Sequence, residues 1–222
     1  SRMNTRTFSW TWNNIATYDK TIGEHHFNVL AGVEAYSYRY DELTASRSKM
    51  AQPDMPELVV GSQLTGGSGY RIDYALVGYL THDYQNKYFF SASYRRDGSS
   101  RFAPETRWGN FWSLGTSWRI DREEFMASTS DWLSALTLKM SYGAQGNDNL
   151  GTYYASKGLY TIVSNLGENA LVSDRMATPN LKWETNLNFN VGIDFSLFNN
   201  RFSGSFDFFT RRSKDLLYSR PI

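Results

Sequence analysis

Two pairs of adjacent residues carry side chains that could support metal binding or acid–base catalysis. They are His25-His26 and Glu123-Glu124. Adjacent side chains of a strand point to opposite faces, so the two histidines cannot chelate one ion together, and His82 stands alone in the sequence. The two glutamates follow Asp121, which we expect to cap a short helix whose dipole favours acids in its first turn. The sequence therefore predicts no catalytic residue, no cofactor-binding residue and no metal ligand.

The run from Arg95 to Arg101 has two competing interpretations. Its guanidinium and hydroxyl groups could bind an anionic or sugar ligand. They could also hold neighbouring loops together through charge-assisted hydrogen bonds and an Asp-Gly turn, and we favour this structural role. The glycine-rich run Thr65–Gly69 lacks the Gly-Lys-Ser/Thr of a phosphate-binding loop, so we expect a flexible loop there.

Period-two alternation of apolar and polar residues predicts the strands that would position these groups. It is clearest between Lys87 and Ile120, where two strands flank a polar loop, Gly98–Arg107. Further strands are predicted at Thr5–Tyr18, Phe27–Tyr36, Tyr70–Asp83, Leu136–Tyr142, Leu187–Leu197 and Phe202–Phe208. The links between them are a short turn at Asp19–Glu24, a long loop at Asp41–Gly69, a tight turn at Gln85-Asn86, a short helix within Asp121–Ser134, the longest loop at Gly146–Asn180 and a hairpin turn at Asn199-Asn200.

The alternation assigns the side chains to two faces of one sheet. We expect an apolar face bearing Phe90, Leu114, Trp118, Leu138, Phe189, Val191, Ile193, Phe195 and Phe206. The opposite, polar face should bear Asn28, Glu34, Ser91, Ser93, Lys139, Asn188, Asn190 and Asp194. The third strand is apolar on both sides between Tyr74 and Leu80, so its facing is ambiguous.

Composition and spacing favour a membrane-spanning barrel over a soluble sandwich. Aromatic residues reach 16% although mean hydropathy is −0.52, which results when every second strand residue faces water and the others face an apolar medium. Several predicted strands exceed ten residues, all five prolines fall outside them, and short links alternate with long ones. A net charge of +1 and the absence of cysteine indicate neither nucleic-acid binding nor disulfides or thiolate metal sites.

Ordered motifs across most of the chain resemble the SusC/RagA-type TonB-dependent transporters. The first is Tyr94-Arg95-Arg96-Asp97-Gly98-Ser99-Ser100-Arg101-Phe102, followed by Arg107-Trp108-Gly109 and Trp118-Arg119-Ile120. Gly146-Asn147, Leu150-Gly151-Thr152-Tyr153, Asn180-Leu181-Lys182-Trp183-Glu184-Thr185, Gly192-Ile193-Asp194-Phe195 and Lys214-Asp215-Leu216-Leu217 continue the resemblance. Departures are small: Ala144-Gln145 and Trp112 replace residues more common in that family.

The resemblance implies that residues 1–222 are part of an all-β, antiparallel transmembrane barrel of about 22 strands, in the bacterial outer membrane. It implies a lipoprotein partner of the SusD type, energy from TonB through a plug region that this chain lacks, contact with outer-membrane lipid, and import of a glycan or peptide. It implies no enzyme activity and no nucleic-acid partner. The opening residues contain no signal peptide, so we expect a partial chain. In this setting Tyr153-Tyr154, Tyr160 and Trp183 could stack on sugars, but aromatic residues beside a barrel rim are more commonly interfacial anchors.

Two alternatives from other classes remain open from the residues themselves. One is a complete eight-stranded barrel of OmpA or OmpX size with a structural or adhesive role, in which the strand near Trp10 would pair with the strand near Phe206. The other is a soluble, carbohydrate-binding β-sandwich, in which a second sheet would cover Phe189 and Phe195.

Overall fold

The computed structural model describes residues 2–46, 63–165 and 168–218, and these form ten strands and two short 3-10 helices. The strands are β1 (Arg2–Ile22), β2 (His25–Ser46), β3 (Gln63–Tyr84), β4 (Tyr88–Ser99), β5 (Trp108–Arg119), β6 (Leu133–Asn147), β7 (Leu159–Asn165), β8 (Glu168–Arg175), β9 (Glu184–Leu197) and β10 (Phe202–Lys214). The helices are η1 (Ile120–Arg122) and η2 (Glu124–Thr129). Among the described residues, no helix has the length and apolarity needed to cross a membrane.

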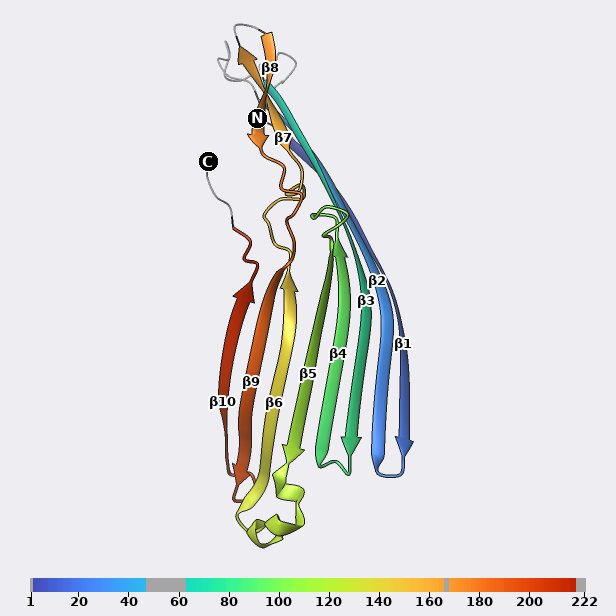
Figure 1. Ribbon diagram of the computed structural model, residues 1–222, viewed down its shortest axis with the longest axis vertical. Helices are drawn as coiled ribbons and strands as arrows, with labels where there is room; N and C mark the ends of the chain where they lie inside the picture. The colour runs from blue at the N-terminus through green and yellow to red at the C-terminus, as the bar shows by residue number, and fades with distance from the viewer. Residues whose placement is uncertain (1, 47–62, 166–167, 219–222) are drawn as a thin grey trace.

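Eight strands form one antiparallel sheet in the order β1-β2-β3-β4-β5-β6-β9-β10. Figure 1 shows this sheet as a tall, curved wall, with the β7-β8 hairpin projecting from its upper end. The prediction of an all-β, antiparallel architecture with about eight long strands is confirmed.

The sheet has two free edges within the described part of the chain. β1 pairs only with β2, and β10 pairs only with β9. A closed eight-stranded barrel would require β1 to pair with β10, so that alternative is wrong. The sandwich is also wrong, because the other sheet is the β7-β8 hairpin and Phe206 is 74% exposed.

The strand registers place every predicted residue on its expected face. Trp118 lies opposite Tyr88 and Leu138, and Leu138 lies opposite Ile193, which lies opposite Phe206. Four of the nine predicted apolar-face residues are at least 41% exposed (Phe90, Leu114, Ile193 and Phe206). The other five are half-buried, and three of them, Trp118, Phe189 and Phe195, pack against aromatic rings on the same face.

The register also settles the facing of the third strand. Tyr74, Leu76 and Leu80 of β3 lie opposite Ala35, Val33 and Val29, which all belong to the apolar face. We use "apolar face" for the side of the sheet that carries the nine predicted residues, and "polar face" for the other.

Short connections lie at one end of the sheet and long ones at the other (Figure 1). The lower end holds the β1-β2, β3-β4 and β9-β10 turns together with η1 and η2. Gly23 adopts a φ of 61° in the first of these turns, a conformation that glycine accepts without strain. The upper end holds the long links and both termini of the described chain, and we call it the rim.

Several strands extend beyond the bounds that the sequence predicted for them. Most of the expected turn Asp19–Glu24 belongs to β1, and the expected loop Asp41–Gly69 begins and ends within strands. The glycine-rich run lies in β3, with Gly66 opposite Leu43 and Gly69 opposite Tyr40, so its prediction as a flexible loop was wrong. Glycine has a low strand propensity, but here the long neighbouring strand β2 provides backbone hydrogen-bond partners for the run. The centre of that loop, residues 47–62, lies outside the described residues.

Two further corrections concern the links. The expected loop Gly146–Asn180 contains the β7-β8 hairpin, which the sequence analysis missed. The expected Asp121 cap is also absent, because Asp121 lies inside η1 and no side chain caps either 3-10 helix. Asp121 instead accepts hydrogen bonds from the Arg119 guanidinium at 2.7 Å and from the Leu136 amide at 3.1 Å.

Candidate functional site

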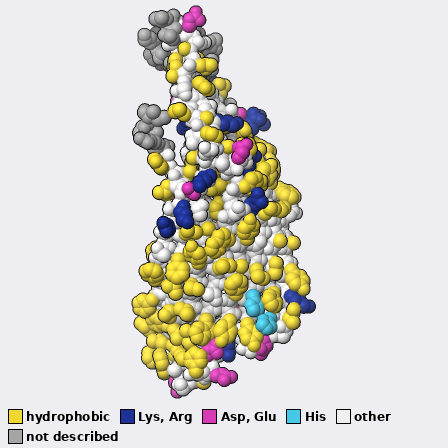
Figure 2. All heavy atoms as spheres, viewed as in Figure 1, with side chains coloured by type: hydrophobic (Ala, Val, Ile, Leu, Met, Phe, Trp, Pro, Cys, Tyr) yellow, Lys and Arg dark blue, Asp and Glu magenta, His cyan; other side chains and the backbone are white. Residues whose placement is uncertain are grey.

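Two rows of aromatic residues bound the apolar face. On the neighbouring strands β4 and β5, Tyr88 lies opposite Trp118, and Tyr94 lies opposite Trp112. The two pairs are six residues apart, so they are separated by roughly 20 Å along the strands. Figure 2 shows hydrophobic side chains gathered over the lower part of the molecule, with most Lys and Arg side chains above them. An apolar band of about 25 Å between aromatic girdles is typical of membrane barrels.

The lower row continues onto the β5-β6 link. The Trp118 ring lies edge-on to Phe125 of η2 with centroids 6.5 Å apart. Glu123 accepts hydrogen bonds from the Tyr88 hydroxyl at 2.5 Å and from the Trp118 indole at 2.9 Å. These hydrogen bonds, with Lys87 nearby, hold the pKa of Glu123 below its usual range. Glu123, which lies between η1 and η2, therefore anchors the link to the aromatic row.

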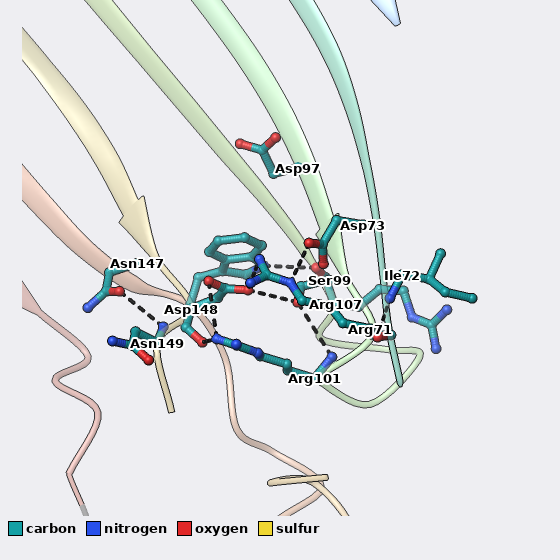
Figure 3. A network of polar contacts seen from close by, with 12 residues as sticks. Arg71, Ile72, Asp73, Asp97, Ser99, Arg101, Arg107, Asn147, Asp148 and Asn149 are labelled. Atoms are coloured by element: carbon teal, nitrogen blue, oxygen red, sulfur yellow. Dashed lines mark hydrogen bonds and ion pairs between the residues drawn. The ribbon is translucent and has the colours of Figure 1, made fainter. Parts of the chain in front are cut away.

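Asp148 is the centre of a polar cluster at the rim (Figure 3). Its carboxylate accepts hydrogen bonds from Arg71 of β3 at 3.0 Å and from Ser99 at the end of β4 at 2.9 Å. Arg101 in the β4-β5 link donates to the Asp148 carbonyl at 2.8 Å. Arg71 also forms an ion pair with Asp73. Asp148, which directly follows β6, thereby joins β3, the end of β4 and the β4-β5 link.

An aromatic core lies beside this cluster. Phe102 is 1% exposed, and its ring centroid lies 5.4 Å from that of Trp183. The Phe111 ring lies edge-on to Trp183 with centroids 5.3 Å apart, and the Trp183 indole donates a hydrogen bond to the Arg107 carbonyl at 2.8 Å. The expectation that Trp183 is an interfacial anchor was therefore wrong, because the indole packs inside the rim.

The Arg95–Arg101 run makes structural contacts within the chain. Ser99 and Arg101 bind Asp148, while the Ser100 hydroxyl and amide bond to the backbone of Ile72 at 2.9 Å each. These contacts hold neighbouring segments of the rim together, which is the structural role favoured for this run. Arg95 and Asp97 remain on the polar face, where they pair with each other at 2.6 Å.

Tyr153 turns toward the polar face and not toward the apolar one. Its ring centroid lies 6.0 Å from that of Tyr38 and 6.1 Å from that of Tyr40. The Arg101 guanidinium lies 5.4 Å from the same ring centroid. Burial, together with the neighbouring Tyr38, raises the pKa of the Tyr153 phenol. The anchor interpretation is thus also wrong for Tyr153, whereas Tyr160 is 69% exposed on the hairpin.

A cavity of about 440 Å³ opens on the polar face next to these clusters. We call it the rim cavity. Its lining includes Glu34, Tyr36, Asp73, Arg95, Asp97 and Trp183. Such a volume falls in the range of small-molecule sites. Sequence reasoning did not identify this cavity, because its lining comes from strands far apart in the chain whose register only the fold reveals.

The histidines occupy the opposite, lower end. His26 bonds to Asp19 at 2.9 Å and to Asp83 at 3.0 Å on the polar face. His82 is not alone, as the sequence analysis held, because its Nε2 lies 3.0 Å from Nδ1 of His25 on the apolar face. Within the described ranges, no three His, Cys, Asp or Glu side chains are grouped so as to hold a metal ion.

A charged trio lies between these ends on the polar face. The Lys139 ammonium of β6 lies 2.8 Å from Asp194 of β9 and 3.1 Å from Asp207 of β10. Gly192 allows this approach, because a side chain there would collide with Asp207. The trio spans three strands, and its ion pairs cross-link β6, β9 and β10 on the polar face.

Comparison with known proteins gives consistent results. The family described as TonB dependent receptor-like, beta-barrel matches residues 1–222. TonB-dependent receptor P3 of Formosa agariphila is 32% identical over 94% of this chain and 22% of its own length. TonB-dependent receptor SusC of Bacteroides thetaiotaomicron is 29% identical over 97% of this chain and 22% of its own length. The chain thus spans about a fifth of the curated relatives that it matches.

Solved structures agree with these relatives. A structure of the RagAB peptide transporter superposes with a TM-score of 0.90 and 28% identity, covering 99% of this chain and 25% of that one. The RagAB peptide importer in its open-open state gives a TM-score of 0.87 and 29% identity, with the same coverage. The open sheet therefore corresponds to one segment of a much larger barrel.

Proposed function

Because the chain belongs to the family of TonB-dependent receptor-like β-barrels, we propose that it forms part of the wall of an outer-membrane nutrient importer. In this role the apolar face meets lipid and the polar face lines the lumen. Residues 1–222 belong to the barrel domain of the intact protein, and the plug and signal peptide lie elsewhere in it.

The observation that carries this proposal is the two-sided sheet with free edges. One face is apolar and bounded by aromatic rows, while the other carries paired charges, amides and hydroxyls. A soluble protein would cover such an apolar face with a second layer, whereas a barrel wall leaves it for lipid. The free edges of β1 and β10 fit pairing with further strands of the intact barrel, because exposed edges otherwise favour aggregation.

We infer that the imported substrate is a glycan or a peptide, taken up with a SusD-like surface lipoprotein and powered through TonB. The support is similarity to SusC and to the RagAB peptide transporter. The protein would act as a transporter and not as an enzyme. Substrate choice would lie mainly in the β2-β3 link and in the link that carries the β7-β8 hairpin, because loops carry variation that strand ladders do not tolerate.

Growth of the source bacterium on single nutrients tests the proposal. We expect deletion of the gene, or of tonB, to abolish growth on one glycan or peptide source, and the wild-type gene to restore it. A gene lacking residues Gly158–Ser173 should give an assembled barrel that restores growth poorly or fails to retain the lipoprotein. Unchanged growth of the gene deletion on every nutrient would contradict import, and normal lipoprotein retention and growth with the loop deletion would exclude the hairpin from recognition.

A further inference from the structure

We propose that the rim cavity is a binding subsite for a neutral saccharide on the import path. This inference rests on the proposed function and narrows its substrate class. The cavity lies on the polar face beside the rim, where an incoming ligand would meet the wall first. Its volume of about 440 Å³ would hold one or two sugar rings.

An aromatic surface is available at this site. Tyr36 lines the cavity and is half-buried on β2. It belongs to the same face as Tyr38 and Tyr40, which contact Tyr153. Among the described residues, the Tyr36 hydroxyl has no hydrogen-bond partner, so both its ring and its polar tip remain available to a ligand. A tyrosine offers an apolar body with a hydroxyl at one end, as a sugar ring requires.

Hydrogen-bonding groups face the same space. Glu34 lies 3.6 Å from Arg95, and both side chains are more than 40% exposed. The carboxylates of Asp73 and Asp97 also line the cavity. Sugar hydroxyls donate and accept, so they match a surface of carboxylate acceptors and guanidinium donors.

The charge pattern selects against anionic ligands. Four carboxylates line the cavity (Glu34, Asp73, Asp97 and Asp148) against two guanidinium groups (Arg71 and Arg95). Arg95 is held by Asp97 at 2.6 Å and Arg71 by Asp148 at 3.0 Å, so neither is free to bind a uronate, a sulfate or a peptide carboxylate. A neutral saccharide meets no such repulsion.

Calorimetric titration of the intact detergent-purified protein tests this proposal independently of growth. The probes are neutral oligosaccharides (maltoheptaose, laminarihexaose, xylohexaose and mannohexaose), hexagalacturonate, and a tryptic digest of casein. We expect at least one neutral oligosaccharide to bind, and Tyr36→Ala to weaken it by about tenfold or more. Tyr36→Phe, which keeps the ring, should stay within about threefold of wild type.

A matched control is Tyr79→Ala, which removes a tyrosine from the same face about 20 Å further along β3 and should leave affinity unchanged. Heat-modifiable migration on gels verifies that each variant barrel is assembled. The proposal is overturned if no neutral oligosaccharide binds, if Tyr36→Ala binds as tightly as wild type, or if the uronate or the peptides are the ligands that depend on Tyr36. Growth that still requires the gene in those cases would leave the importer proposal standing.

Discussion

Substituting Asp148 with alanine should release the rim links from the barrel wall. The change removes the acceptor of the Arg71 and Ser99 hydrogen bonds, at 3.0 and 2.9 Å. It also removes the carboxylate 3.6 Å from the Arg101 guanidinium. Arg101 is 11% exposed, so its charge would stay desolvated without an anionic partner.

The magnitude follows from burial and from the contacts that survive. Removing one partner of a fully buried ion pair costs about 3–5 kcal/mol. Asp148 and Arg71 are 15% and 27% exposed, and Arg71 keeps Asp73, so the cost should be lower than in a dry interior. We expect Asp148→Ala to weaken the docking of the rim links by about 2–4 kcal/mol, which shifts their equilibrium toward the open form by roughly 30- to 700-fold.

Hydrogen exchange of the intact protein, followed by mass spectrometry, measures this opening. The amides of Ser99 and Ser100 bond to Arg107 and Ile72, so exchange in peptides covering 99–107 should accelerate in Asp148→Ala. Exchange in β9 should not change. Asp174→Ala, an exposed aspartate on the hairpin, is the control and should behave as wild type. Unaltered exchange at 99–107 would refute the view that Asp148 holds the rim together.

Two substitutions test the faces of the sheet and the packing of the rim. Val191→Lys on the apolar face, at a position that lies between the two aromatic rows, should cost about 2–4 kcal/mol of folding free energy in lipid. Asn190→Lys on the polar face should cost little, and equal costs in a bilayer folding titration would contradict the assigned faces. Gly146→Ala would place a Cβ 2.1 Å from the Phe111 ring and should destabilise the barrel by about 1–3 kcal/mol in the same titration. Gly78→Ala is the control, because a Cβ there would meet no atom nearer than 3.9 Å, and it should be tolerated. Similar stabilities of the two variants would show that the Phe111 ring has room to move.

Features that depend on local alternation could be predicted from the sequence. From Leu187 to Leu197 the apolar and polar residues alternate without a break, and the facing of this strand was correct in every position. The same holds for the tight turn at Gln85-Asn86, whose φ values are 55° and 52° and which is closed by a hydrogen bond from the Lys87 amide to the Tyr84 carbonyl at 2.9 Å. Period and turn chemistry act over a few residues, which is why a single sequence reveals them.

Features that depend on distant partners could not be predicted. Gly66 and Gly69 have low strand propensity, and only pairing with β2 makes them strand residues. The contact of Tyr153 with Tyr38 joins residues far apart in the chain, and so does the hydrogen bond from Arg71 to Asp148. The rim cavity arises from such contacts, so its residues look ordinary in the sequence.

Spin labels at successive positions from 186 to 196 of the intact protein in bilayers test most directly whether this sheet separates lipid from lumen. The described chain contains no cysteine, so single labelling sites are readily introduced. Collisions with dissolved oxygen, which concentrates in lipid, should peak at Leu187, Phe189, Val191, Ile193 and Phe195 and fall at each residue between them. A profile without this period of two, or with its maxima on the intervening polar residues, would contradict the assignment of the apolar face to the membrane.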